Sequence, residues 1–197
     1  MMEAEEIKKM GKIIKENKQP KIDLEKLPNY AAANSIACPR SADEVYSLGV
    51  NLQNYLGDIY LDLSGTSHGS QKVFYSKLAV EQLIGKEEIE KLANYNLNRL
   101  LSYFYSNGGP VIEPPLAEEK AREITPFFDR IVTNALYQLD LLVNDAIKEK
   151  MEAAELEKAI NKNIIELYTS LSNLIPEKEI QDAFNELITV RKAIGEY

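Results

Sequence analysis

Hydrophobic residues recur every three or four positions along most of the chain after residue 40, and this spacing predicts amphipathic helices. One helix is expected to begin at a capping box, Ser41-Ala-Asp-Glu44. There the serine hydroxyl accepts from the amide of Glu44, and the glutamate carboxylate accepts from the amide of Ser41. The helix is expected to run to Leu63 and to end at Gly65 in a left-handed cap. Its apolar positions are Val45, Leu48, Leu52, Tyr55, Ile59 and Leu63.

Two glycines weaken this prediction. Gly49 and Gly57 each cost about 1 kcal/mol in a helix interior relative to alanine. A break at Gly57 would free residues 58–63, whose alternation also suits a β-strand. The periodicity favours the helix, and the strand is the alternative.

Two more helices are predicted in the middle of the chain. Ser70 is expected to cap the first, which ends at Gly85, and the second ends at Ser106-Asn-Gly-Gly109. The apolar stripe of the second helix is Ile89, Ala93, Leu97, Leu100 and Phe104. The segment 106–115 then holds Gly108, Gly109, Pro110, Pro114 and Pro115. It is either a boundary between two halves, 41–105 and 116–197, or an exposed functional loop.

The C-terminal part predicts three long helices in series. A short helical turn over 117–124 precedes Thr125-Pro126, where a cap and a proline at the first helical position restart the chain as a long helix. Pro176 restarts the last helix. The apolar stripes are Phe128, Ile131, Ala135, Leu139, Leu142 and Ala146, then Leu156, Ile160, Ile164, Leu167, Leu171 and Leu174, then Ile180, Phe184, Leu187 and Ile194. The predicted fold is therefore all-α, a bundle of about five to six helices.

The first forty residues predict an extended N-terminal arm. Residues 5–17 have the pattern of a short amphipathic helix, which is marginal in water unless it packs on something. Pro20, Pro28 and Pro39 then exclude a long regular element. The predicted organisation is an arm over 1–40 and a helical bundle over 41–197.

Charge limits the partners that the chain is expected to bind. The formal net charge is −8, and residues 107–197 hold 17 acidic against 10 basic residues. Such a surface repels phosphate, so nucleic acid is not expected to bind over a broad surface. Local binding through a basic patch on the arm or near Arg99 is the remaining alternative. No run of about 18 apolar residues predicts a membrane span. The charged start and the lone Cys38, expected to be a small buried residue, favour the cytoplasm.

His68 is the only histidine, and it lies among serines in Ser64-Gly-Thr-Ser-His-Gly-Ser70. Ser/His catalysis needs an orienting third residue and an oxyanion site, and the sequence signals neither. The backbone ahead of a helix beginning at Ser70, with Lys72, is an alternative anion site formed by His68, Ser70 and Lys72. It departs from the P-loop pattern, which requires Lys-Ser or Lys-Thr after the glycine.

Metal chemistry has one weak candidate. Acidic residues at Glu118, Glu119, Glu123, Asp140 and Asp145 are similar in kind to the carboxylates by which all-α nucleotide pyrophosphohydrolases hold magnesium. The spacing differs, because Tyr137-Gln-Leu-Asp140 stands where Glu-x-x-Asp is required. Solvated helix faces explain these residues better, so no metal and no cofactor are predicted.

A second short segment, Ile124-Thr-Pro-Phe-Phe128, resembles the core of a sliding-clamp-binding peptide. In that motif an aliphatic residue precedes two aromatic residues by three and four positions. The segment departs from the motif at Ala121, where glutamine is required, and Phe128 also belongs to the core stripe. Ile124 and Phe127 are therefore carried only as candidate partner contacts.

The favoured interface is on the third predicted helix. Tyr95, Arg99 and Tyr103 lie off its apolar stripe, and exposed tyrosine beside arginine is a composition typical of interfaces. The sequence shows no polar cluster facing inward, which favours a non-enzymatic interaction or assembly subunit that binds a protein partner or forms a homo-oligomer. A metal-dependent hydrolase of nucleotides or phosphorylated substrates, and an accessory subunit of a nucleic-acid-processing complex, are the alternatives.

Overall fold

The computed structural model describes residues 36–107, 114–149 and 151–194, apart from the side chains of 99–101, 103–107, 148 and 149. The chain divides into two units, Met1–Ala32 and Ala33–Tyr197, and every described residue lies in the second. Five helices and no strand make up this described part, which confirms the predicted all-α bundle. The predicted arm helix over 5–17 and most of the segment 106–115 lie outside it.

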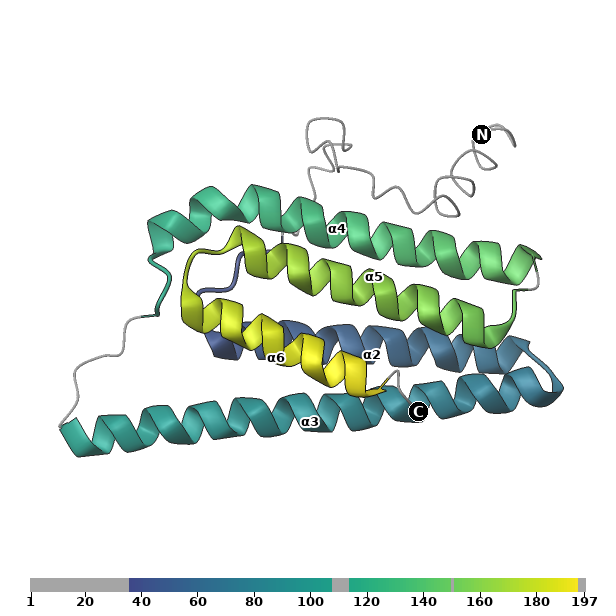
Figure 1. The fold of residues 1–197 in the computed structure, drawn as a ribbon, viewed down its shortest axis with the longest axis horizontal. Coiled ribbons are helices and arrows are strands. Elements are labelled where there is room, and N and C mark those ends of the chain that lie inside the picture. Colours follow the sequence, from purple (N-terminus) through teal and green to yellow (C-terminus); the bar gives the residue numbers. More distant parts are fainter. Residues whose placement is uncertain (1–35, 108–113, 150, 195–197) are drawn as a thin grey trace. The chain divides into compact units, whose positions relative to one another are not determined.

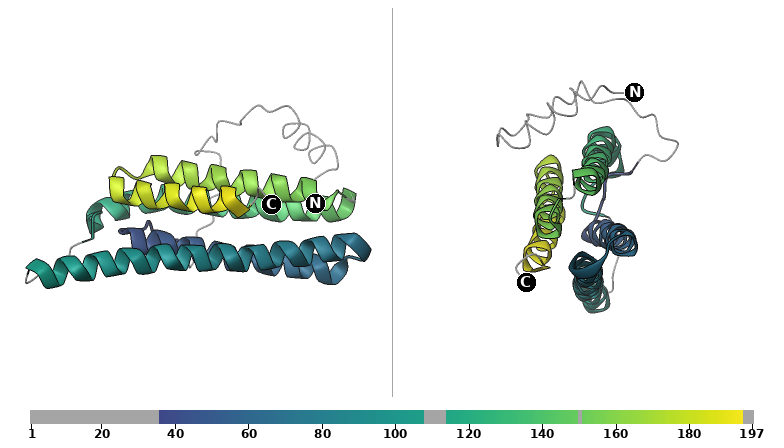
Figure 2. Two further views of the ribbon diagram at one scale, coloured as in Figure 1. Left: turned by 60° about the horizontal axis from the view of Figure 1, so that its bottom comes forward. Right: turned by 90° about the vertical axis from the view of Figure 1, so that its right-hand side faces the viewer.

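The helices pack as a hairpin against a second group (Figures 1 and 2). The hairpin pairs α2 (Ala42–Thr66) with α3 (Gly69–Asn107), joined by the two-residue turn Ser67-His68. The second group consists of α4 (Glu118–Glu149), α5 (Ala153–Leu174) and α6 (Lys178–Ile194). In this group α5 contacts both α4 and α6, and α6 lies across both helices of the hairpin. The core lies between the two groups.

The start of α2 follows the predicted chemistry with one difference. The Ser41 hydroxyl accepts from the amide of Glu44 at 3.4 Å, as a cap should. The Glu44 carboxylate accepts instead from the amide of Arg40, at 2.7 Å, one residue before the predicted donor. The preceding chain runs over the helix start, and this brings the Arg40 amide within reach.

The end of α2 was predicted three residues early, at Leu63, and with the wrong cap. The helix stays regular through Gly57 and over 58–63, so the helical interpretation is confirmed and the strand is excluded. It runs to Thr66, whose hydroxyl donates to the carbonyl of Asp62 at 3.1 Å. The left-handed residue is Gly69, with φ 59°, in place of Gly65. Gly69 begins α3, so the positive φ belongs to the turn between the two helices.

Gly85 does not end a helix, contrary to the sequence prediction. α3 passes through it as one element of 39 residues. A β-carbon at this position would overlap Cδ1 of Ile194. Glycine is therefore suited to this position because α6 approaches the helix closely, and the local signal for a helix stop was misleading.

The fourth helix is also longer than predicted. α4 is continuous from Glu118 across Pro126, whereas the sequence suggested a separate turn over 117–124. Proline has no N–H to continue the helical ladder. The preceding Thr125 hydroxyl donates to the carbonyl of Ala121 at 2.8 Å and so adds a bond in this weakened turn.

The strap, residues 36–40, packs along α4. The amide of Ile36 donates to Asp129 Oδ1 at 2.8 Å, and the amide of Cys38 donates to Thr125 Oγ1 at 3.1 Å. Cys38 is 2% exposed and belongs to the core. These five residues, which the sequence analysis placed in the arm, thus contact the bundle directly.

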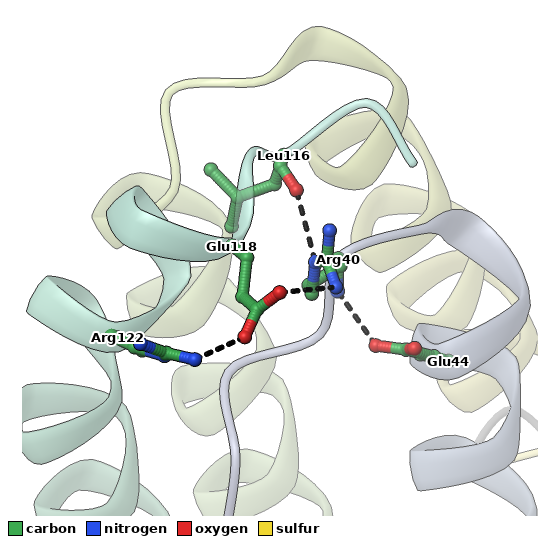
Figure 3. A network of polar contacts seen from close by, with 5 residues as sticks. All are labelled: Arg40, Glu44, Leu116, Glu118 and Arg122. Atoms are coloured by element: carbon green, nitrogen blue, oxygen red, sulfur yellow. Dashed lines mark hydrogen bonds and ion pairs between the residues drawn. The ribbon is translucent and has the colours of Figure 1, made fainter. Parts of the chain in front are cut away.

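Arg40 joins the strap to the start of α4 (Figure 3). Its Nε donates to the carbonyl of Leu116 at 3.2 Å, and the amide of Leu116 donates back to the Arg40 carbonyl at 3.2 Å. Its Nη1 lies 4.0 Å from a carboxylate oxygen of Glu118, and Arg122 binds the other oxygen of that carboxylate. The network closes one end of the bundle around the buried Leu116 side chain.

Candidate functional site

The side of α3 that faces away from α2 carries a row of aliphatic side chains. Val73, Val80 and Ile84 are 70%, 54% and 52% exposed, and Tyr95 is 73% exposed. At about 100° per residue these four positions fall within a sector of about 60°. The opposite side of the same helix is buried and includes Leu78, Gln82 and Ile89.

Charged residues alternate with this row. Lys77 is exposed and forms an ion pair with Glu81, at 3.3 Å, on its own helix. Lys91 pairs in the same way with Glu88, at 2.5 Å. The exposed Glu87 lies between them on the same side. We define the α3 outer face by its members: Val73, Lys77, Val80, Ile84, Glu87, Lys91 and Tyr95.

The C-terminal end of α3 continues past the start of α2 (Figures 1 and 2). Asn96 donates to Asp43 Oδ1 at 3.0 Å, which places it level with the first turn of α2. The helix continues for the eleven residues from there to Asn107, or about 16 Å. Leu97 is exposed rather than part of the predicted buried stripe, and Asn96 is buried in its place.

The predicted partner contacts have different positions. The exposed Tyr95 lies on the α3 outer face, where its contact role stays a prediction, while the side chains of Arg99 and Tyr103 are outside the described set. In the segment that resembles a clamp-binding peptide, Ile124 is buried and Phe127 is about half exposed. Both belong to the continuous α4, so this segment is not displayed as a peptide.

The predicted anion site lies at the turn between α2 and α3. His68, Ser70 and Lys72 are all exposed. Because α3 begins at Gly69, Ser70 is inside the first turn rather than in the capping position. Anion binding at this turn stays a prediction.

Three of the five acidic residues considered for a metal site, Glu118, Glu123 and Asp140, have basic or hydroxyl partners. The Tyr55 hydroxyl donates to Asp140 Oδ1 at 2.6 Å, and the pKa of Tyr55 rises to about 12, first through burial and then through this bond. Glu118 binds Arg122, and Glu123 binds Lys120 at 2.9 Å. Within the ranges that the structure describes, no three His, Cys, Asp or Glu side chains converge to hold a metal ion.

A buried polar cluster inside the bundle was missed by the sequence analysis, which expected none. Arg191 of α6 is 1% exposed, and its Nη1 donates to Gln82 Oε1 of α3 at 2.5 Å. Gln53 Oε1 of α2 lies 3.5 Å from the same nitrogen. The Gln82 amide nitrogen in turn donates to the carbonyl of Leu78 at 3.1 Å.

No carboxylate among the described residues forms an ion pair with this guanidinium. Burial lowers the pKa of Arg191, and Tyr60, Tyr168 and Glu157 act against that shift. Both tyrosine hydroxyls are buried without a well-formed hydrogen bond. Burial raises the pKa of Tyr60 to about 12, although the positive charge of Arg191 opposes the rise.

The sequence did contain a signal for this cluster. Arg191 lies four residues after Leu187 and seven after Phe184, in the apolar stripe of its helix. Gln82 likewise lies four residues after Leu78 and seven before Ile89. A polar residue in phase with an apolar stripe is the pattern that indicates a buried polar contact.

Comparison of the chain with known protein families, with curated proteins and with solved structures found no match. Across the described ranges, every helix lacks the combination of length and apolar character that crossing a bilayer requires.

Proposed function

We propose that this chain is a non-enzymatic helical assembly subunit, and that it pairs with a second copy of itself through the α3 outer face. The observation that carries the proposal is the row of three aliphatic side chains, Val73, Val80 and Ile84, each more than half exposed. Fully burying such a side chain contributes about 1.5–3 kcal/mol. A second helix that covers the row therefore gains a substantial share of the free energy of a stable contact.

The spacing along this face is that of a coiled-coil seam. Positions 73, 77, 80, 84, 87 and 91 alternate steps of four and three residues, as the a and d positions of a heptad do. The central seam positions are Val80 and Ile84, and Lys77 and Glu87 flank them. Polar residues at seam positions select one register and orientation at some cost in stability.

The face is complementary to itself when two copies run antiparallel. With the two helices level at position 82, Val80 of each copy lies opposite Ile84 of the other, and Lys77 lies opposite Glu87. A twofold axis repeats both contacts, as in other isologous dimers. A parallel pair in register would instead place Lys77 against Lys77 and Glu87 against Glu87, which like-charge repulsion disfavours.

Charge reversal on the full-length chain tests this pairing. Lys77→Glu should weaken self-association about tenfold or more, because two carboxylates then face each other across each contact. Glu87→Lys should weaken it similarly, and the double variant should restore it by exchanging the partners. Lys72→Glu makes the same charge change off the seam and is the matched control. Sedimentation equilibrium measures the association, and thermal melts monitored by circular dichroism confirm that each variant is folded.

Three results would count against the proposal. A wild-type chain that remains monomeric at high micromolar concentration rules out a second copy as the occupant of this face. A double variant that associates no better than the single variants rules out the antiparallel register. Equal weakening by Lys72→Glu shows that total charge, rather than the seam, controls association.

A further inference from the structure

A groove of about 440 Å³ runs between α5 and α6, on surfaces that the proposed pairing through α3 does not use. The groove is shallow and open to solvent. The α5 side is formed by residues at helical spacing, and α6 contributes two adjacent basic residues from its last turn. The groove is lined by Lys158, Asn161, Lys162, Ile165, Glu166, Arg191 and Lys192.

The lining is strongly basic in a chain whose net charge is −8. It holds four cationic side chains and one carboxylate. That carboxylate, Glu166, lies 3.9 Å from Lys162 and offsets one of the four charges. Lys158 and Lys192 are exposed and have no ion-pair partner among the described residues. Lys158 and Lys192 thus present two unpaired ammonium groups at the groove, and the buried Arg191 adds a positive charge beneath them, on which Glu157 also acts.

The floor of the groove contains buried polar atoms that the protein does not satisfy. Arg191 Nε is buried and makes no hydrogen bond, although the Nη1 of the same guanidinium binds Gln82. Asn161 Oδ1 is also buried without a partner. The unpaired Arg191 N–H carries an unfavourable desolvation free energy that a bound acceptor can offset. The Asn161 oxygen is itself an acceptor and does not favour an anion. A guanidinium N–H at the floor and ammonium groups at the rim are together a donor set suited to an oxyanion.

Charge and donor geometry identify the class of ligand. Guanidinium groups bind phosphate oxygens through directed N–H bonds, and lysine ammonium groups act on phosphate as point charges. A single carboxylate would neutralise only one of the two unpaired ammonium groups, whereas a phosphate ester or a polyphosphate carries two or more negative charges. We propose that the groove between α5 and α6 binds a phosphate-bearing small molecule through Arg191, Lys158 and Lys192.

Titration of the full-length chain with pyrophosphate tests the proposal, with acetate at equal ionic strength as the comparison anion. Isothermal titration calorimetry should show saturable binding of pyrophosphate, and the melting temperature should rise with its concentration. Lys158→Gln and Lys192→Gln should each weaken binding about tenfold, because each removes one ammonium group from the rim. Both side chains are exposed, so neither variant should disturb the core. Lys120→Gln makes the same charge change on α4 and should bind as the wild type does.

Arg191→Lys keeps the charge and loses the planar fork of donors, so it should weaken binding even when the variant remains folded. The two lysine variants keep the test decisive if this core substitution prevents folding. Absence of saturable binding at millimolar pyrophosphate overturns the proposal. Equal weakening by Lys120→Gln overturns it as well, since binding would then follow total charge. Loss of binding in Lys72→Gln alone would place the anion at the turn between α2 and α3 instead.

Discussion

Arg191 is the side chain whose burial most needs a physical explanation. A charged group removed from water loses several kcal/mol of solvation, and a carboxylate partner ordinarily offsets part of that loss. Here the nearest acceptor is the neutral amide oxygen of Gln82, at 2.5 Å. The guanidinium therefore depends on one close acceptor, and removing that acceptor should cost more than removing the charge itself.

Paired substitutions test this asymmetry. Gln82→Leu should lower the free energy of unfolding by about 2–4 kcal/mol, because it leaves a buried charge without its close acceptor. Arg191→Met removes the charge and should lower the free energy of unfolding by less. The loss in the double variant should be clearly smaller than the sum of the two single losses. Urea unfolding of the four proteins measures the coupling. Additive effects, or a larger loss in Arg191→Met than in Gln82→Leu, would contradict the assigned role of Gln82.

Because Tyr60 is buried in the same cluster, we expect the stability of the protein to decline at alkaline pH. Its folded-state pKa is raised to about 12 by burial, whereas an unfolded tyrosine titrates near 10. Between these pH values the unfolded chain releases the Tyr60 proton and the folded chain keeps it. The contribution of Tyr60 to the free energy of unfolding is therefore complete below a pH of about 10 and is lost as the pH rises toward the folded-state pKa. Tyr60→Phe should flatten this decline. Tyr95→Phe, at an exposed position, is the control, and urea midpoints measured across the alkaline range give the slope.

At the scale of the elements, two glycines in α2 have opposite surroundings. A β-carbon at Gly49 would lie 2.8 Å from Cδ2 of Leu187, a buried residue of α6. A β-carbon at Gly57 would lie 3.8 Å from Cβ of Gln82, which is an ordinary van der Waals distance. Helix propensity favours alanine at both positions, so packing against α6 decides the difference.

The same substitution should therefore have opposite signs at these two positions. Gly57→Ala should stabilise the protein by about 0.5–1 kcal/mol through helix propensity. Gly49→Ala should destabilise it by about 1–3 kcal/mol, because Leu187 must move within a packed core. Denaturant midpoints of the two variants give the comparison directly. Stabilisation by Gly49→Ala would show that α6 is not held as close to α2 as the structure places it.

Sequence reasoning was accurate where the determining chemistry is local. The Ser41 cap is an example, because the hydroxyl and the amide that it binds lie three residues apart. It failed at Gly85 and Pro126, which are frequent helix breakers and here lie inside long helices. At Gly85 the space that a β-carbon would need is taken by Ile194, more than a hundred residues away, and no local pattern contains that neighbour.

The candidate surfaces also include one residue that local periodicity located and others that it did not. Tyr95 could be placed off the buried stripe by periodicity alone. Val73, Val80 and Ile84 all lie in the helix that was predicted to end at Gly85, but they were not compared as one row. Ending that helix at Gly85 also separated them from Glu87 and Lys91, the later positions of the seam. Arg191 was passed over because charged residues are assigned to solvent, although its position in the apolar stripe of α6 indicated burial. Continuity of a helix is thus needed before its surfaces can be interpreted.

At the scale of the whole molecule, the boundary between arm and bundle determines what must be kept for folding. The division of the chain falls between Ala32 and Ala33, and the strap lies on the bundle side of it. Removing the strap would expose the contacts of Cys38 and leave Asp129 and Thr125 without the two amides that they accept from. A bundle that begins after residue 40, the boundary suggested by the proline content, would lack the strap, and we expect it to be less stable for that reason.

Two shortened chains distinguish the boundaries. A chain that begins at Ala33 should melt close to the full-length protein, and its Cys38 should react slowly with a thiol reagent at neutral pH, because burial raises the pKa of that thiol to about 11. A chain that begins at Ser41 should lose about 3 kcal/mol through the missing burial and hydrogen bonds, a fall of roughly 6–12 °C in melting temperature. Circular dichroism melts of all three chains make the comparison. Equal melting of the Ala33 and Ser41 chains would show that the strap contributes nothing to the bundle, and rapid labelling of Cys38 in the Ala33 chain would show that the strap detaches readily from α4.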